Sequence, residues 1–375
     1  MNAPYRGTIV RESLSPLSPI SRPPISAIVP TWNALRYLPA CLMALRAQLG
    51  AADEIILVDN ASRDNAAAWA RRFAADVRLL ELPRNLGFAG GVNAGITAAC
   101  NDLLLLCNDD ALVEPACVAG LWEALHNHPQ AGAAAGVLTF STRPGVVASV
   151  GISVRRNGVA TDLGMGAPVS ALPIAPHEIF GASGGLMLLR RAMIDDIGPF
   201  AAEFFNYLED VDLAWRARLR GWSCRLAPTA RARHVYSASS VQGSPFKQRL
   251  LGRNRLRAII RCMPAPLLRQ CLPAILSYDV LALAYAALRR QPAIATGRME
   301  ALRELPALRE QRRSIQARRT ATIGDLARWL EPALSPVATL RQQEQLARKR
   351  RHGGILQRRS GQGLARLNIG TFDLR

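Results

Sequence analysis

Three polar residues directly follow one of the most apolar runs in the chain. The run Leu103–Cys107 is succeeded by Asn108, Asp109 and Asp110. A carboxylate at the end of a buried strand is costly unless it faces a cleft or binds a cation. Adjacent acids at such a place can hold Mg²⁺ or Mn²⁺ and leave coordination positions for diphosphate oxygens. The same residues also suit a simple turn, so both interpretations stay open.

A second acidic group, Glu209–Asp212, stands at the predicted start of a helix. Acids are common there because they interact well with the helix dipole. The functional alternative is a general base that takes the proton of a hydroxyl as it attacks the anomeric carbon of a sugar. His234 follows a predicted strand at 223–226 and a turn at Pro228. It is either a further metal ligand or a packed histidine.

A glycine- and asparagine-rich segment, Arg84–Gly95, is predicted to be a loop that opens a helix. Glycine lets the backbone approach a ligand closely, and a helix N-terminus favours an anion. Loops also carry glycine for turn geometry alone, so the segment by itself does not distinguish a ligand-binding loop from a structural turn.

The elements that must position these residues alternate along the first third of the chain. Strands are predicted at 25–30, 54–58, 77–82 and 103–107, and helices at 34–49, 65–75 and 92–100. This alternation indicates a parallel sheet with helices on both faces. Ligands bind beyond the carboxyl ends of such strands. Those ends carry Thr31–Asn33, Asp59–Asn60 and Asn108–Asp110, which are therefore expected to converge.

The charge of the chain is concentrated in its C-terminal third. The 375 residues carry a net charge of +19, and nearly half of them are apolar. Residues 1–245 hold 21 Lys/Arg against 20 Asp/Glu, whereas residues 246–375 hold 26 against 8. Such a basic region seeks polyanions, either nucleic acid or anionic lipid. It lacks interleaved aromatic residues and a zinc pattern, which argues against nucleic acid as the partner.

Cysteine usage and the N-terminus point to the cytoplasm. Seven cysteines lie in apolar runs without a CxxC pair, which suits a reducing compartment. Arg6 and Arg11 precede no apolar stretch, so no signal peptide is expected.

Taken in order, these segments resemble the family 2 glycosyltransferases, in the rhamnosyltransferase-like branch. The matching stretches are Ala27–Asn33, Ile56–Ser62, Asn85–Gly95, Leu105–Asp110, Gly181–Gly185, Phe205–Leu213 and His234. The resemblance covers roughly residues 25–260. It implies an α/β GT-A fold, a Rossmann-like nucleotide-diphospho-sugar transferase domain, followed by a basic, mainly helical C-terminal region.

The resemblance also implies a role for each matching residue. The nucleotide sugar is expected to contact Thr31, Asn33, Asp59, Asn60, Asn85, Gly87, Asn93 and Asp109. Asp109 stands where many relatives have proline, so it is expected to assist rather than to bind the metal. Asp110 and His234 match the ligands of Mg²⁺ or Mn²⁺. Asp210 matches the catalytic base, and Glu209 is expected to position that base or the acceptor.

The implied reaction is a single inverting displacement from a dTDP- or UDP-sugar, with dTDP-rhamnose as the expected donor. The acceptor is a saccharide or a polyprenyl-diphosphate-linked saccharide of a cell-surface polysaccharide. No QxxRW-type pattern of processive synthases is present, so addition of one or a few sugars is expected. The alternatives are a transferase for another hexose or a furanose, and an inactive or nucleic-acid-binding scaffold. The joint presence of Asp59, Asp110, Asp210 and His234 argues against the inactive scaffold.

Four regions are expected: a flexible Ser/Pro-rich leader at 1–24, the GT-A domain at 25–250, a basic helical region at 251–331, and a basic tail at 332–375. The apolar stretch 271–288 is flanked by arginines, and Asp279 near its middle makes spanning a bilayer costly. It is expected to lie in the membrane interface or to pack on the enzyme. These features predict a cytoplasmic protein in peripheral contact with the anionic inner face of the cell membrane.

Overall fold

The computed structural model describes residues 22–235, 244–335 and 338. Its strands are β1 (Ile25–Thr31), β2 (Glu54–Asp59), β3 (Arg78–Glu81), β4 (Leu103–Cys107), β5 (Ala111–Val113), β6 (Ala131–Phe140), β7 (Arg143–Ser149), β8 (Ile152–Arg155), β9 (Ala160–Asp162), β10 (His177–Ile179), β11 (Leu186–Arg190), β12 (Ser223–His234) and β13 (Leu330–Glu331). Its α-helices are α1 (Leu38–Arg46), α2 (Ala66–Phe73), α3 (Gly87–Ala98), α4 (Cys117–His126), α5 (Arg191–Ile197), α6 (Glu209–Leu219), α7 (Pro245–Cys262), α8 (Ala265–Leu288), α9 (Pro292–Arg303), α10 (Leu305–Ala317) and α11 (Ile323–Ala327).

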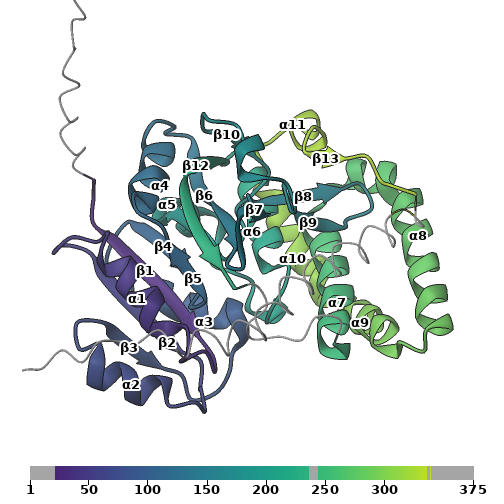
Figure 1. Cartoon of the computed structure of the whole chain (residues 1–375). Coiled ribbons are helices and arrows are strands. Elements are labelled where there is room, and N and C mark those ends of the chain that lie inside the picture. The colour runs from purple at the N-terminus through teal and green to yellow at the C-terminus, as the bar shows by residue number, and fades with distance from the viewer. Residues whose placement is uncertain (1–21, 236–243, 336–337, 339–375) are drawn as a thin grey trace, which may run out of the picture.

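A mixed sheet forms the centre of the molecule (Figure 1). Its strand order is β10-β12-β6-β11-β4-β1-β2-β3, with β5 and β7 attached to β12 and β6. The four strands predicted from the sequence, β3, β2, β1 and β4, pair in parallel. β11 then pairs antiparallel to both β4 and β6. The predicted α/β architecture is confirmed.

Helices cover both faces of this sheet because the strands alternate their side chains between the two faces. Ala27 and Val29 of β1 pack in one core cluster with residues of α1, α2 and α4. Ile28, which lies between them, packs in a second cluster with residues of α3, α5 and α6. The helices cover the faces of the sheet, and the loops that follow β1, β2 and β4 lie at its carboxyl edge.

Two elements differ most from the sequence prediction, and α1 is also shorter than predicted, at Leu38–Arg46 rather than 34–49. α3 begins at Gly87 rather than at residue 92, so most of the predicted glycine loop is helical. Small residues explain this, since a Cβ at Gly95 would lie 2.4 Å from Cγ2 of Ile28, and only glycine lets the helix pack this closely on β1. β12 also continues through Pro228, where a turn was predicted, because its pairing with β6 shifts register around that proline.

The C-terminal region is mainly helical, as expected from the sequence, and its helices pack beside the sheet domain. Residues of α6, α7 and α8 share a third core cluster with β8 and β13. The expected domain division at residue 250 lies inside α7. The predicted leader and tail lie almost entirely outside the described residues, so both stay predictions.

One helix in the described part of the chain, α8, is long and apolar enough to cross a membrane, judged by length and composition alone. Its inner face is packed on the enzyme through residues such as Leu267, Cys271 and Ile275. All seven cysteines are free, and all except Cys100 are buried.

Candidate active site

An aspartate and a histidine meet at the carboxyl end of β4. Nε2 of His234 lies 2.9 Å from Oδ1 of Asp110, and both side chains are buried. Strand pairing creates this contact, since His234 at the end of β12 is paired with Ala111 of β5, the residue after Asp110. The amide of Asn108 also lies 3.4 Å from Nε2 of His234. The structure thus brings together the two residues that the sequence comparison implied as metal ligands.

This pair is compatible with a divalent cation. Two ligands in adjacent octahedral positions, each about 2.1 Å from a metal, lie about 3 Å apart. The 2.9 Å separation of the two ligand atoms agrees with that value. Among the described residues, no group of three or more His, Cys, Asp or Glu side chains is arranged to hold a metal. A cation here would therefore take its remaining ligands from water and from the substrate.

Several carboxylates surround this pair. Burial and the neighbouring carboxylate of Asp110 raise the pKa of Asp109 to about 7, although the Thr31 hydroxyl and the Trp32 backbone N–H lower it in part. Burial lowers the pKa of His234, but the carboxylates around it, led by Asp110, raise it above its ordinary value. Crowded carboxylates of this kind are typical of sites that bind positive charge.

Asp210, in the first turn of α6, has the properties of a general base. Its Oδ2 accepts a hydrogen bond from the backbone N–H of Gly184 at 3.1 Å. Burial is the main reason that the pKa of Asp210 rises to about 6; the carboxylate of Asp162 also raises it, and the Gly184 hydrogen bond lowers it in part. A base with such a pKa is ionised at neutral pH and still accepts a proton readily.

Its neighbour Glu209 behaves differently. Glu209 is 5 % exposed, and burial together with the charge of Asp210 raises its pKa well above the usual value. Both effects favour the neutral form of the Glu209 carboxyl. Asp212, the third acid, is fully buried against Arg216 at 2.8 Å and Arg261 at 3.3 Å. That ion-paired group anchors α6.

Two glycines lie between Asp210 and the Asp110–His234 pair. Gly184 and Gly185 precede β11, and the carbonyl of Gly185 accepts the backbone N–H of Asn108 at 3.1 Å. A Cβ at Gly184 would lie 3.8 Å from Oδ2 of Asp210, and one at Gly185 would lie 3.8 Å from Cε1 of His234. Asp210 and His234 therefore lie on either side of a single peptide unit.

The loop before α6 is held in an unusual conformation. Phe205, Tyr207 and Leu208 all have positive φ, between 65° and 70°, which costs of order 1–3 kcal/mol for each side chain of this size. Nδ2 of Asn254, on α7, lies 2.8–3.0 Å from the carbonyl oxygens of Phe204, Asn206 and Tyr207, which share its two hydrogens. Asn254 thus fixes the segment that presents the acid pair.

The sequence did not identify two residues of this site. Asn254 is fully buried, but it lies in an arginine-rich stretch that was interpreted only as a basic helix. Asp162, at the end of β9, lies close enough to both Asp210 and His234 that its carboxylate raises the pKa of each. No strand was predicted around Asp162, and a lone aspartate in a glycine-rich segment carries no recognisable signal.

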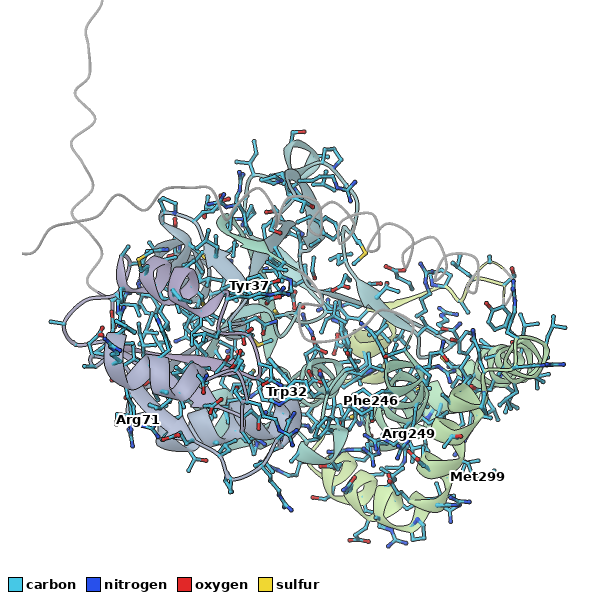
Figure 2. The ribbon with its side chains drawn as sticks, turned by 60° about the horizontal axis from the view of Figure 1, so that its bottom comes forward. Trp32, Tyr37, Arg71, Phe246, Arg249 and Met299 are labelled. Atoms are coloured by element: carbon cyan, nitrogen blue, oxygen red, sulfur yellow. The ribbon has the colours of Figure 1, made fainter. Side chains whose placement is uncertain are left out.

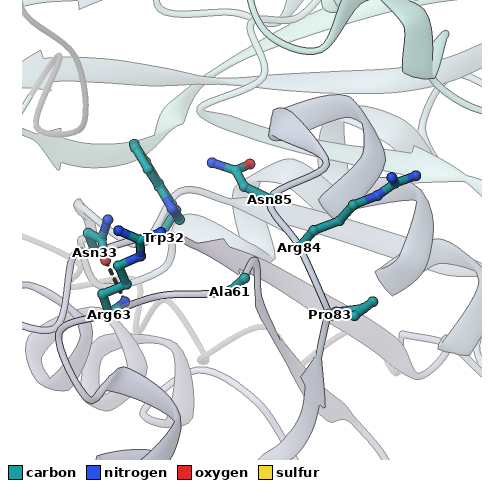
Figure 3. A pocket seen from close by; sticks show the side chains of 7 residues that line it. All are labelled: Trp32, Asn33, Ala61, Arg63, Pro83, Arg84 and Asn85. Carbon is teal, nitrogen blue, oxygen red and sulfur yellow. Dashed lines mark hydrogen bonds between the residues drawn. The ribbon is translucent and has the colours of Figure 1, made fainter.

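A cavity of about 570 Å³ opens at the ends of β1, β2 and β3 (Figure 3). It is lined by Trp32, Asn33, Ala61, Arg63, Pro83, Arg84 and Asn85. Oδ1 of Asn33 accepts the backbone N–H of Arg63 at 2.7 Å, which joins the loops after β1 and β2. The volume suits a nucleoside. Of the predicted nucleotide-binding residues, Asn33 and Asn85 line this cavity.

The other predicted nucleotide-binding residues do not line this cavity, and Asp59 and Asn60 among them are buried. Asp59 is buried at the end of β2 and accepts the backbone N–H of Ser62 at 3.1 Å. Asn60 donates to the carbonyl of Gly87 and accepts from the N–H of Leu86, both at 2.8 Å. Asn60 thereby holds the loop that leads into α3.

Three further predicted residues are placed by backbone contacts. Asn93 exchanges two hydrogen bonds with the backbone of Phe200, at 2.7 and 3.0 Å. Gly87 packs under Phe205, where a Cβ would lie 2.1 Å from the carbonyl oxygen. Thr31 is buried beside Asp109, and its carbonyl accepts the N–H of Asn60 at 2.9 Å.

Comparison with known proteins gives a consistent result. Residues 26–198 match the model of glycosyl transferase family 2. The chain is 29 % identical over 213 residues to the N-acetylglucosaminyl-diphospho-decaprenol L-rhamnosyltransferase of Mycobacterium tuberculosis, covering 51 % of this chain and 69 % of that protein. It is 24 % identical over 179 residues to the poly-beta-1,6-N-acetyl-D-glucosamine synthase of Staphylococcus aureus, which is 47 % of this chain but only 41 % of that protein.

Solved structures agree on the fold. The mannosyltransferase PcManGT from Pyrobaculum calidifontis, in complex with GDP-Man and Mn²⁺, has a TM-score of 0.50 at 17 % identity and covers 90 % of this chain and 88 % of that one. GalNAc-T7, with UDP, GalNAc and Mn²⁺, has a TM-score of 0.56 at 11 % identity and covers 76 % of this chain and 57 % of that one. Residues 26–198 form a family 2 glycosyltransferase domain, rhamnosyltransferase-like in sequence, and the chain has the GT-A fold.

Proposed function

We propose that this glycosyltransferase transfers L-rhamnose from dTDP-rhamnose, with inversion, to a polyprenyl-diphosphate-linked saccharide at the inner face of the cell membrane. The observation that carries the proposal is the position of Asp210, a buried base whose pKa is about 6, one peptide unit from the Asp110–His234 pair. The choice of donor and acceptor is supported by the mycobacterial relative, whose name specifies both a rhamnosyl group and a decaprenyl-diphosphate acceptor.

Asp210 and its neighbours account for the displacement. The acceptor hydroxyl oxygen forms a bond to the anomeric carbon, while the bond from that carbon to the nucleotide's diphosphate oxygen breaks. Oδ of Asp210 takes the hydroxyl proton, and burial favours the neutral form of Glu209 beside it. Because attack and departure occur on opposite faces of the sugar, the anomeric configuration inverts.

Asp110 and His234 would hold Mg²⁺ or Mn²⁺, which when bound neutralises charge on the departing nucleoside diphosphate. Chelation by EDTA is therefore expected to abolish transfer, and added Mn²⁺ or Mg²⁺ to restore it.

His234→Ala is expected to raise the Mn²⁺ concentration for half-maximal activity by at least about tenfold, because loss of even an outer-shell contact costs that much. Metal-titrated initial rates measure the shift. An unchanged titration curve in His234→Ala would exclude His234 as a ligand.

The pH dependence follows from the raised pKa of Asp210, which is about 6. Below that value the carboxyl is protonated and has no capacity to accept the acceptor's proton. We expect kcat/KM to be level above pH 7 and to fall about tenfold for each pH unit below about 6. A profile at saturating Mn²⁺ measures this limb. A limb centred near pH 4 would mean that Asp210 is not the base or is not buried in the working enzyme.

A donor screen tests the whole proposal. Purified full-length protein is incubated with Mn²⁺, a panel of dTDP- and UDP-sugars, and a polyprenyl-diphosphate-linked N-acetylglucosamine acceptor. Release of dTDP from dTDP-rhamnose alone, with a product of inverted configuration by NMR, is the expected result. Turnover of a donor that carries another hexose or a furanose would leave the enzyme class unchanged and would show that L-rhamnose is not the transferred sugar. A product of retained configuration would contradict the mechanism.

A further inference from the structure

Helix α8 has two faces of different character. Its inner face is fixed to the enzyme by Asp279, which lies 2.9 Å from Nη1 of Arg255 and 2.8 Å from Nε of Arg298. The ring of Tyr278 packs under the same two guanidinium groups. A helix held in this way through its middle lies flat on the domain, because crossing a bilayer would break both ion pairs.

The outer face of α8 is apolar and open. Its large exposed side chains are Leu272, Leu276, Val280, Leu283 and Leu288, which are 44 %, 54 %, 68 %, 41 % and 81 % exposed. Their spacing of three to five residues places them on one side of the helix. Figure 1 shows α8 at the edge of the molecule, to the right of the sheet domain. The stripe is about 25 Å long, since each helical residue adds about 1.5 Å.

Charge on this face has one sign only. Arg269 lies near its beginning, and Arg289 and Arg290 follow its end; all three are exposed, and no ion pair to an acid is recorded for any of them among the described residues. The one acid of α8, Asp279, is turned inward. On the neighbouring α9, Met299 and Leu302 are half exposed, and Figure 2 shows Met299 on the opposite side of the molecule from Arg71 of α2.

We infer that the outer face of α8 docks this enzyme on an anionic lipid surface, with the leucine and valine side chains in the headgroup region and the three arginines on lipid phosphates. An apolar stripe bounded by cations is what an interfacial helix requires. A second copy of the chain fits less well, because two antiparallel α8 helices would bring Arg269 of one copy against Arg289 and Arg290 of the other. Residues 339–375 carry nine Lys/Arg against two acids, so they too would repel this face.

The inference deepens the proposed function, since a polyprenyl-linked acceptor resides in a membrane, but its test needs no turnover. Full-length protein is sedimented with vesicles of phosphatidylcholine alone and of phosphatidylcholine mixed with phosphatidylglycerol. We expect stronger binding to the mixed vesicles. The double variant Leu276→Glu/Val280→Glu should bind at least about tenfold more weakly to both. Arg289→Gln/Arg290→Gln should lose about fivefold per arginine on the mixed vesicles only.

Ile174→Glu is the control, because it replaces an aliphatic side chain that is 93 % exposed outside α8 by one glutamate, half the charge of the double variant. It should bind vesicles as the unmodified protein does. All variants should keep their activity on a water-soluble saccharide acceptor, so loss of docking is separable from loss of catalysis. Unchanged vesicle binding by the Leu276→Glu/Val280→Glu variant would overturn the inference. A dimer in solution that this variant dissociates would instead make the face a contact between copies.

Discussion

Asp210→Asn is expected to lower kcat by about 10²- to 10⁴-fold, the usual contribution of a positioned general base. Asparagine keeps the shape of the side chain and retains an oxygen to accept the N–H of Gly184. It does not take up a proton at neutral pH, so the acceptor hydroxyl would have to lose its proton to water. Initial rates at saturating donor and acceptor measure the effect, and donor KM should change little.

Glu209→Gln is the matched control on the adjacent position. Burial and the Asp210 charge raise the pKa of Glu209 well above its usual value, which favours the neutral form of its carboxyl. A neutral amide of the same shape should therefore retain most of the activity. If Glu209→Gln were as inactive as Asp210→Asn, the two acids would have to act as one unit, or their roles would be exchanged.

Thermal stability distinguishes a catalytic role from a structural one. The pKa of Asp210 is about 6, above the ordinary aspartate value, so ionising this carboxyl disfavours the folded state. Stability from this group is full below about pH 4 and is lost as the pH rises toward 6. At pH 7, Asp210→Asn should therefore have a Tm equal to or above that of the unmodified protein. A lower Tm would indicate that Asp210 stabilises the fold.

The sheet could be predicted because its signals are local. Apolar runs such as Leu103–Cys107 and Glu54–Asp59 are fully or almost fully buried strands, and the alternation of strands and helices fixes their parallel pairing. The start of α3 could not be predicted, because a helix with four glycines contradicts helix propensity. Contact with β1 decides that element: a Cβ at Gly95 would lie 2.4 Å from Cγ2 of Ile28, so only glycine lets the helix pack there.

The site was predicted where residues directly follow strands, and not where long-range packing decides. Asp110 and His234 are 124 positions apart, and the family resemblance paired them correctly as neighbours. The hydrophobic periodicity of the sequence does not predict this contact, because the contact depends on the pairing of β5 with β12. Asp162 and Asn254 act through neighbours that the topology brings in from distant segments, so neither carried a local signal.

The loop from Phe204 to Leu208 is where the two parts of the enzyme meet. On the sheet side, the Phe205 carbonyl accepts the N–H of Ala89 at 3.2 Å, and only glycine fits at position 87 beneath it. On the helical side, Asn254 holds three other carbonyls of the same loop. The strained backbone before Asp210 is thus fixed from both sides, by the sheet domain and by the C-terminal helices.

Asn254→Ala should therefore reduce both stability and catalysis. Loss of the amide leaves buried carbonyls without their donor, which costs about 2 kcal/mol or more in the free energy of unfolding. As the loop relaxes, Asp210 shifts from its productive position, and kcat should fall by at least about tenfold. Asp210 also becomes better hydrated, so the acidic limb of the kcat/KM profile should move from about pH 6 toward the ordinary aspartate range.

That shift in the pH profile separates a positioning role from simple loss of folded protein, which lowers the amplitude of the profile and leaves its midpoint unchanged. Gln248→Ala is a suitable control, because it truncates another amide of α7 whose side chain contacts Gln291 rather than the loop. Its profile should keep a midpoint near pH 6. If Asn254→Ala kept the midpoint as well, the conformation of the loop would be set by the sheet side alone, through Gly87 and Ala89, and the C-terminal helices would serve only to stabilise the domain.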